Sequence, residues 1–472
     1  MSLNLWCEER QQPNKTESEL PSDPIGHRTV FEQDYDRILF STPIRRLSDK
    51  TQVFPLDTND GVRTRLTHSH EVSNIAKSIG LSILHSKPDA FGDADAMRTV
   101  LPLLGAIGLA HDLGNPPFGH QGEAAVCDWF TKNSEWIFDR KAKEGGEAIP
   151  PVTDEFRTEF LKFDGNPQTL RLLCHLQTSV GRAGLDLSAA TIMAAIKYPF
   201  RAGKEGNGPL NKKHGFFLSE QPIVEWARCQ TGIAEGQRHP LTWIMEAADD
   251  IAYSMLDVED AMKKGIFSPD DLYNILLIDD SVSKDGIFVK IKEGFKKSDD
   301  SRRIAPIVRD IKIGYIRSYL ILDMVNHATN QFIGNLKSIF DLSHAEPLMD
   351  NSELCNCLKK MARDFAFGNS EVLFEEAKGR KAIEELLDDF WHAISDRKEY
   401  DDLRSKRRSA KGKFVYSLLS PNYLEEAFDP PCGTPDVAKT IRYRELRLLT
   451  DMISGMTDNF AIAMRDKIRS AC

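Results

Sequence analysis

Histidine and aspartate residues that follow an apolar helical segment are the best candidates for chemistry in this sequence. An apolar run over 101–109 leads into His111-Asp112, and the chain then breaks at 114–117, Gly-Asn-Pro-Pro. A buried helix that ends in His-Asp must give these polar groups partners, because burying them unpaired is costly. A metal ion suits an imidazole beside a carboxylate. The alternative is a helix C-terminus with a hydrogen-bonded histidine.

Two further residues can complete a metal site. His68 begins one predicted helix, and Asp249 lies within another helix that is rich in core residues. Three helices can direct polar side chains to one interior point. Two imidazoles and two carboxylates suit Mn²⁺, Mg²⁺, Fe²⁺ or Co²⁺ better than structural zinc, and they leave positions open for water and a phosphate oxygen. Spacing alone does not establish the pairing with Asp249.

A second pair of reactive side chains follows the break. A new helix is predicted to begin near Gly119, and it carries His120 and Glu123. Residues three apart lie on one face of a helix, so the carboxylate can contact the imidazole. The alternative for His120 is a solvent-facing position in the first turn.

Composition limits the class of protein. The 472 residues are 41% hydrophobic and 28% charged, which is typical of a soluble globular protein with a large core. No run of about 18 apolar residues predicts a membrane span, and the polar N-terminus does not resemble a signal peptide. The eight cysteines lack zinc-finger spacing, so we expect reduced thiols and a cytoplasmic location. A net charge of −10 argues against a broad nucleic-acid-binding face, although basic residues are dense over 37–65.

Helical periodicity predominates along the chain, and the predicted fold class is all-α. The best strand signal is the segment DGIFVKI, residues 285–291. We expect a flexible N-terminal arm over 1–27, a core domain over 28–265, and a C-terminal helical region over 266–472 that packs on the core. Residues 132–156 lose periodicity and gain charge, glycine and proline, which indicates an insertion or exposed loop.

The pattern H…HD…D is the signature of the HD phosphohydrolase superfamily. The fuller strings resemble one branch of it, the deoxynucleoside triphosphate triphosphohydrolases, whose best-known bacterial members are dGTPases. The matching strings occur in family order and span most of the chain: STPIRRLSDKTQV (41–53), RTRLTHSHEV (63–72), HDLGNPPFGHQGE (111–123), FDGNPQ (163–168), KYP (197–199), HPLTWIMEAADDIAYSMLDVEDA (239–261) and ISGMTDNFA (453–461).

This resemblance implies a fold and selects the ligands. The fold would be the helical HD-domain phosphohydrolase fold with additional C-terminal helices. The family position of the metal histidine is His68 rather than His70, and that of the carboxylate is Asp249 rather than Asp250.

The resemblance also implies a reaction. Water would attack the α-phosphorus of a dNTP, with dGTP preferred, and the products would be a deoxynucleoside and intact tripolyphosphate. His120 matches the residue that acts next to the scissile bond, as general acid or in-line base, with Glu123 orienting it.

Further family positions would bind the substrate. Cations would hold the triphosphate, tyrosines would add a hydroxyl or a ring edge, Gln52 and Asp257 would read the sugar 3′-OH, and Val53 would crowd a ribose 2′-OH. The triphosphate-binding positions are Arg65, Lys197, Tyr198, Lys213, Tyr253 and, as a weaker candidate, Arg447.

Relatives in this family are homo-oligomers, often hexamers, and some respond to a nucleotide effector or to single-stranded DNA. Asp164 and Pro167 depart from the family, where Glu and Ala are common. Two alternatives stay open: another HD phosphohydrolase, such as a 5′-nucleotidase or phosphodiesterase, and a single-stranded nucleic-acid-binding protein.

Overall fold

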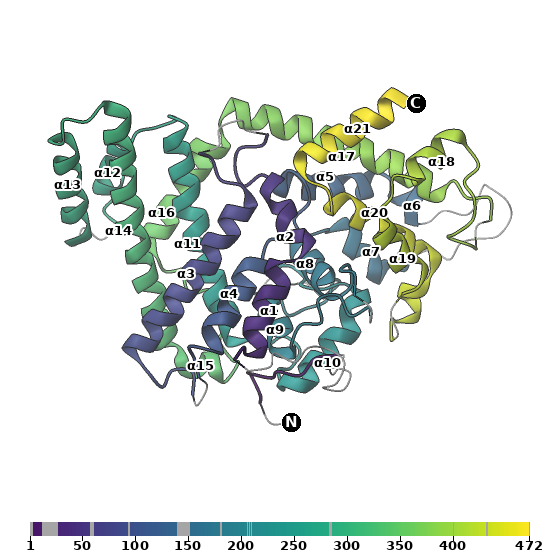
Figure 1. Ribbon diagram of the computed structural model, residues 1–472, viewed down its shortest axis with the longest axis horizontal. Helices are drawn as coiled ribbons and strands as arrows, with labels where there is room; N and C mark the ends of the chain where they lie inside the picture. Colours follow the sequence, from purple (N-terminus) through teal and green to yellow (C-terminus); the bar gives the residue numbers. More distant parts are fainter. Residues whose placement is uncertain are drawn as a thin grey trace.

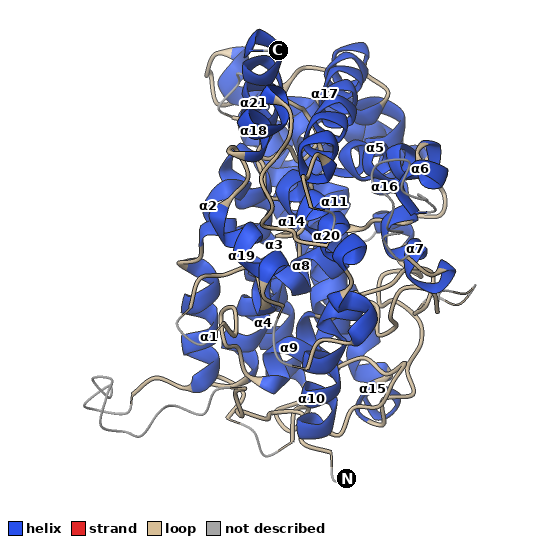
Figure 2. Cartoon of the chain, turned by 90° about the vertical axis from the view of Figure 1, so that its right-hand side faces the viewer, coloured by secondary structure: helices blue, strands red, loops and turns tan. Residues whose placement is uncertain are grey.

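The computed structural model describes residues 3–11, 27–56, 61–92, 95–138, 152–179, 182–204, 206, 208, 210–282, 286–399, 401–430 and 433–471. Regular structure in these ranges is helical, and pairing of the β type is limited to isolated bridges such as Thr51 with Thr64. Figure 2 accordingly shows helices and loops without strands. The predicted all-α class is confirmed.

The helices of the first half differ widely in length. Their bounds are α1 (Val30–Leu39), α2 (Thr42–Arg46), η1 (Leu47–Asp49), α3 (Arg65–Ser86), α4 (Val100–Ala110), α5 (Gly119–Lys132), α6 (Ser134–Phe138), α7 (Asp154–Leu161), α8 (Gly165–Cys174), α9 (Ala189–Ala195), η2 (Leu218–Glu220), α10 (Gln221–Thr231) and α11 (Pro240–Lys263).

The second half contains several longer helices and one π-helical segment, η3. Its elements are α12 (Pro269–Ile278), α13 (Gly286–Asp299), α14 (Ala305–Gly334), α15 (Leu336–Phe340), α16 (Glu353–Met361), η3 (Ala362–Phe367), α17 (Ser370–Ser395), α18 (Ala410–Tyr416), α19 (Pro421–Phe428), η4 (Asp436–Lys439), α20 (Ile441–Ser454) and α21 (Asp458–Ala471).

Helix α4 lies between two hydrophobic cores. Leu103, Leu104 and Ile107 belong to the core that α3, α11 and α14 share, whereas Ala106 and Leu109 belong to the core beneath α5, α17 and α20. Burial on all sides explains why the sequence of α4 is apolar all round. It also means that α4 delivers the residues at its C-terminal end to the interior of the molecule.

Two long helices, α3 and α11, pack on α4. α3 packs on α4 and α11, and α14 packs on both α3 and α11, to the left of the centre in Figure 1. α17 packs on α5, α18, α20 and α21 and runs along the upper edge in the same view. Helices from the end of the chain therefore reach the same centre as α4 and α5.

The N-terminal residues that the structure describes are packed rather than arm-like. Leu5 and Cys7 are buried, the amide of Asn4 donates to the carbonyl of Thr231 at 2.8 Å, and Arg10 forms an ion pair with the buried Asp34 at 2.7 Å. The expectation of a flexible arm over 1–27 does not hold for residues 3–11, because their apolar side chains join the core. Residues 12–26 lie outside the described ranges.

The structure also corrects two local predictions. Residues 285–291, the best strand signal, lie largely in α13, where Phe288, Ile291 and Phe295 are buried; their spacing of three and four is helical. The predicted insertion over 132–156 begins as the end of α5 and as α6, with Ile137 and Phe138 in the core. Residues 139–151 of it lie outside the described ranges.

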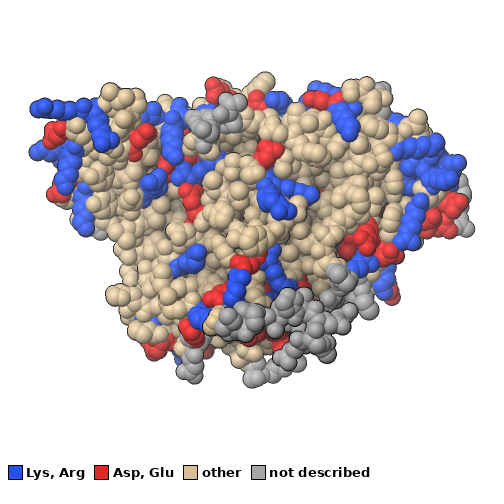
Figure 3. All heavy atoms as spheres, viewed as in Figure 1, with Lys and Arg blue, Asp and Glu red and all other residues tan. Residues whose placement is uncertain are grey.

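The surface mixes both signs of charge. On the face shown in Figure 3, Lys and Arg side chains are interspersed with Asp and Glu and do not join into one continuous band. Among the described helices, none has both the length and the apolar composition needed to cross a bilayer.

Candidate metal and substrate site

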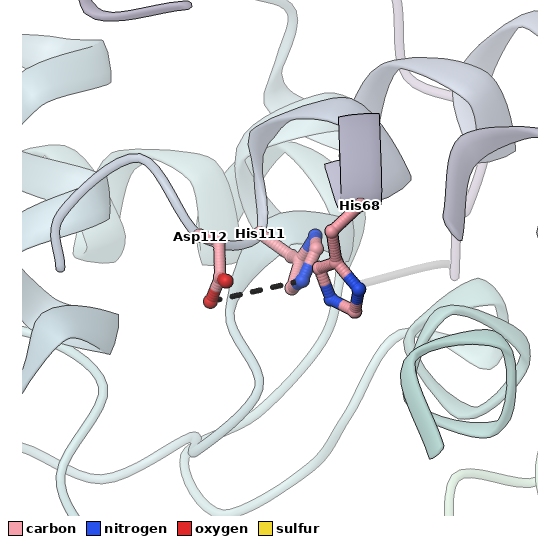
Figure 4. A group of neighbouring side chains, drawn as sticks. All are labelled: His68, His111 and Asp112. Atoms are coloured by element: carbon pink, nitrogen blue, oxygen red, sulfur yellow. Dashed lines mark ion pairs between the residues drawn. The ribbon is translucent and has the colours of Figure 1, made fainter. Parts of the chain in front are cut away.

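Three helices bring four predicted ligands together. His68 lies in the first turn of α3, His111 and Asp112 follow the last residue of α4, and Asp249 lies in the middle of α11. Oδ1 of Asp249 is 3.3 Å from Nε2 of His68 and 3.4 Å from Nε2 of His111. Oδ1 of Asp112 is 3.7 Å from Nε2 of His111, and Figure 4 shows His68, His111 and Asp112 converging.

Neighbouring groups fix the orientation of two of these side chains. Nδ1 of His111 donates to the carbonyl of Gly108 at 2.7 Å, which leaves Nε2 facing the cluster. Asp112 accepts a hydrogen bond from Nδ2 of Asn115 at 2.7 Å and pairs with Arg65. Supporting hydrogen bonds of this kind are typical around metal ligands, because they set the ring orientation and the free nitrogen.

The donor set fits a divalent cation. Nε2 of His111 is buried and has no hydrogen-bond partner among the described residues. Ligands that share an octahedral ion at about 2.1 Å lie about 3 Å apart, close to the separations seen here. His68, His111 and Asp112 therefore form a possible metal-binding site, with the carboxylate of Asp249 against both histidines.

The electrostatics also favour a positive charge at this point. Burial by itself would lower the pKa of His111, but the carboxylates of Asp112 and Asp249 outweigh it and raise the pKa to about 9. For Asp249, burial would raise the pKa, but His111 and Lys197 hold it well below its usual range. The cluster thus stabilises a cation, either a proton or a metal ion.

A left-handed turn separates the cluster from the second predicted pair. Phe118 and Gly119 have φ angles of 60° and 55°, and Gly119 is also the first residue of α5. Nδ1 of His120 donates to Oε2 of Glu123 at 2.8 Å, and Oε1 of Glu123 accepts from the amide of Gly165 at 2.7 Å. The hydrogen bond to Glu123 raises the pKa of His120. The predicted pairing along α5 is present, and the side chain of His120 also faces solvent, with 80% of it exposed.

One cavity of about 570 Å³ connects the two groups. Its walls contain all the predicted site residues except Asp257 and Arg447, namely Gln52, Val53, Arg65, His68, His111, Asp112, His120, Glu123, Lys197, Tyr198, Lys213, Asp249 and Tyr253. Residues from distant parts of the sequence therefore meet in one pocket.

Three of the predicted cations are paired with carboxylates at this pocket. Nζ of Lys197 lies 3.4 Å from Oδ2 of Asp249, Lys213 pairs with Asp164, and Arg65 pairs with Asp112. Asp164, a departure from the family sequence, also caps α8 through the amide of Asn166.

Two predicted residues lie elsewhere. Asp257 is buried, and its carboxylate oxygens have no hydrogen-bond partner among the described residues; burial raises its pKa well above the usual value. Arg447 is buried within an aromatic cage that includes Phe160 and Phe217 and forms an ion pair with Glu159 at 3.0 Å. The structure does not place Arg447 on the pocket wall.

Several pocket residues were not predicted from the sequence. Asn115 and Asn166 lie within quoted motifs, so their positions carried a usable signal. Arg363 and Glu376 also line the pocket, from η3 and from the start of α17. The π-helical turn interrupts the periodicity there, and we find no signal in the sequence that would have identified these two residues.

Comparison with known proteins agrees with this geometry. No family model matches the chain. Proteins of Listeria monocytogenes and Listeria innocua named deoxyguanosinetriphosphate triphosphohydrolase-like protein are each 35% identical to it over 458 residues, which is 92% of this chain and 92% of each relative. The chain belongs to the deoxyguanosinetriphosphate triphosphohydrolase-like family. In this member of the family, residues from six of the seven quoted motifs line one pocket, whereas none of those from 453–461 is on its wall.

Proposed function

We propose that this chain is a metal-dependent dNTP triphosphohydrolase that prefers dGTP and releases a deoxynucleoside and tripolyphosphate. The observation that supports it best is one pocket whose walls hold the His68–Asp249 cluster, the His120–Glu123 pair and three cations. A volume of about 570 Å³ is within the usual range for small-molecule sites, roughly 300–1,000 Å³. The names of the Listeria relatives support the same substrate class.

His68, His111, Asp112 and Asp249 would hold the metal, with Mn²⁺, Mg²⁺, Fe²⁺ or Co²⁺ as suitable ions. When bound, such an ion polarises a phosphoryl oxygen and lowers the pKa of water. The chain's own contribution is to orient the ligands: Gly108 fixes the ring of His111, and Asn115 and Arg65 fix the carboxylate of Asp112.

His120 would transfer the proton at the scissile bond. Its Nδ1 is engaged with Glu123, so Nε2 is the nitrogen available to substrate. The hydrogen bond to Glu123 raises the pKa of His120 and so favours its protonated form, which suits a general acid that protonates the departing 5′-oxygen. As an in-line base, the same nitrogen would instead accept a proton from the attacking water.

Arg65, Lys197 and Lys213 would bind the triphosphate, because each is a cation on the pocket wall. Their carboxylate partners hold them in place before substrate binds. Tyr198 and Tyr253 line the same pocket and would contribute a ring edge or a hydroxyl.

Gln52 and Val53 would read the sugar. Oε1 of Gln52 is buried without a hydrogen-bond partner in the described part of the chain, so a 3′-OH donor would satisfy it. Val53 is apolar and buried, and it would disfavour a 2′-OH. Asp257 does not line the pocket, and we assign it no contact with the sugar.

The remaining expectations stay predictions. These are the boundaries at 28–265 and 266–472, the cytoplasmic location, assembly into a homo-oligomer such as a hexamer, and an effect of nucleotides or single-stranded DNA on activity.

The decisive experiment identifies the phosphate product. Purified protein is incubated with Mn²⁺ or Mg²⁺ and with each common NTP and dNTP, and the phosphates are separated by ion chromatography. We expect tripolyphosphate, with dGTP turned over fastest. Pyrophosphate or orthophosphate as the main product would exclude the proposed reaction.

A further inference from the structure

The motif ISGMTDNFA, residues 453–461, has no role in the chemistry proposed above. Its Asp458 begins α21 and is 2% exposed. Oδ1 of Asp458 accepts from the amide of Phe118 at 2.9 Å. Oδ2 accepts from the amide of Thr51 at 2.9 Å and also from the hydroxyl of Thr51. One carboxylate thus joins the residue before Gln52 to the turn before His120.

The hydrogen bond from Phe118 to Asp458 stabilises an unfavourable backbone conformation. Phe118 is left-handed, with φ 60° and ψ 20°, a conformation that a residue with a Cβ disfavours. Its ring packs against Gly379 of α17, where an added Cβ would lie 2.5 Å from the ring. Because α5 starts at the next residue, the conformation of Phe118 sets the direction in which His120 points.

Lys50 makes a second connection from the same region. Its Nζ is buried and donates to the carbonyl of Asn115 at 2.5 Å and to that of Ser454 at 2.8 Å. Asn115 in turn donates to Asp112. Lys50 therefore links the end of α20 to the loop that orients a predicted metal ligand.

Three partners of these two residues are on the pocket wall. Thr51, Asn115 and Phe118 all line the cavity of about 570 Å³. We call the contacts that Asp458 and Lys50 make with these residues the clamp. A clamp that only stabilised the core would hold residues away from the pocket. The C-terminal segment therefore contacts the sugar-reading segment and the catalytic turn at the same time.

We propose that Asp458 and Lys50 are positioning residues that fix Gln52 and His120 relative to each other, so that reading of the 3′-OH and proton transfer act on one bound substrate. This inference rests on the proposed function. It predicts that loosening the clamp impairs turnover and sugar discrimination together.

The main test is Asp458→Asn, which preserves shape and removes one acceptor oxygen. The matched control is Asp466→Asn on the same helix, whose exposed carboxylate pairs only with its neighbour Arg465 among the described residues. We expect Asp458→Asn to keep wild-type metal content and to lose about 10²-fold in kcat, as misplacement of catalytic groups by about 1 Å can do. The rate ratio of dGTP to 2′,3′-dideoxy-GTP should fall as well, and the control should match wild type.

Two further measurements make the test specific. Hydrogen exchange should accelerate in peptides covering 50–54 and 114–119 in Asp458→Asn and stay unchanged in the control. In a Gln52→Ala background, Asp458→Asn should cause no further loss of the dGTP to dideoxy-GTP ratio, because both changes act through one contact. Thr51→Val, which removes only the hydroxyl donor, should give a smaller effect of the same kind in case Asp458→Asn folds poorly.

The outcomes separate the two proposals. Faster exchange with unchanged kcat and unchanged sugar discrimination would mean a purely structural clamp and would overturn the inference, as would unchanged exchange. If wild type yields no tripolyphosphate, the proposed function fails independently. The clamp is then judged by calorimetric binding of dGTP and dideoxy-GTP, where unchanged discrimination in Asp458→Asn overturns it and reduced discrimination supports it.

Discussion

At the scale of single residues, the same side-chain type has different surroundings at neighbouring positions. His68 is buried against Asp249, whereas His70, two residues along α3, is exposed. Asp249 faces both histidines, whereas Asp250 pairs with Lys359 at 2.8 Å. Sequence composition alone cannot distinguish the members of these pairs, but the family motif can, and the geometry agrees with its choice.

His68 and His70 allow a controlled test of the metal site. His68→Ala should abolish bound metal and turnover together, because the loss of one of four ligands leaves an incomplete site. His70→Ala should retain both. Elemental analysis of the two purified variants checks this, and full metal content in His68→Ala would refute the assignment.

The His120–Glu123 pair predicts a change in pH dependence. His120→Ala should keep its metal but turn over dGTP roughly 10²–10⁴ times more slowly, the usual contribution of a positioned acid or base. Because the hydrogen bond to Glu123 raises the pKa of His120, Glu123→Gln should move the His120-dependent limb of the kcat profile to lower pH. A profile that does not move would show that Glu123 does not set this pKa.

At the scale of elements, the sequence pattern predicted those helices and helix ends that depend on interactions between residues close in sequence. The apolar sequence of α4, its end at Ala110 and the start of α5 at Gly119 all follow from periodicity and from helix-breaking residues. Arg447 shows the limit of this reasoning. Its family position suggested a phosphate ligand, but its surroundings depend on how α20 lies against α7 and the residue before η2, where Phe160, Phe217 and Glu159 enclose it. Such long-range packing leaves no periodic signal.

The turn between α4 and α5 gives a prediction at this scale. Gly119 is left-handed, and an added Cβ would lie 2.5 Å from Nη2 of Arg65. Gly119→Ala should therefore lower stability by about 1 kcal/mol or more through backbone strain, and it should reduce kcat by displacing Arg65 from Asp112. Gly314→Ala is the control, since a Cβ there meets nothing within 4 Å inside α14 and helix propensity favours alanine. Thermal midpoints and kcat of both variants decide the point.

At the scale of the whole molecule, the metal cluster lies where distant parts of the chain meet. α3, α4 and α11 carry the ligands, while α20 and α21 reach the adjoining loop through Lys50 and Asp458. Groups that are charged and close together in the folded state are far apart when the chain unfolds. The occupancy of this one site should therefore be visible in global stability.

Metal removal at different pH values tests this link. In metal-free protein, Asp112 and Asp249 raise the pKa of His111 to about 9 despite its burial, compared with about 6.5 in the unfolded chain. A group whose pKa is higher in the folded state contributes stability that is fully present below about pH 6.5 and is lost as the pH rises to about 9. Metal-loaded protein has no proton to lose from His111, so its stability should lack this dependence.

The gap in the free energy of unfolding between metal-loaded and metal-stripped protein should therefore widen from pH 6.5 to pH 9 and level off above it. About 1.4 kcal/mol per pH unit and proton gives a widening of about 3 kcal/mol. Burial lowers the pKa of Lys50 to about 7, so the loss of its proton in the folded state acts in the opposite direction. This contribution is present in both forms, so the gap between them reports mainly on His111. Differential scanning calorimetry with excess Mn²⁺ or with chelator measures it, and His111→Ala should abolish the gap. A gap that is constant across this pH range would show that His111 does not exchange its proton for a metal ion.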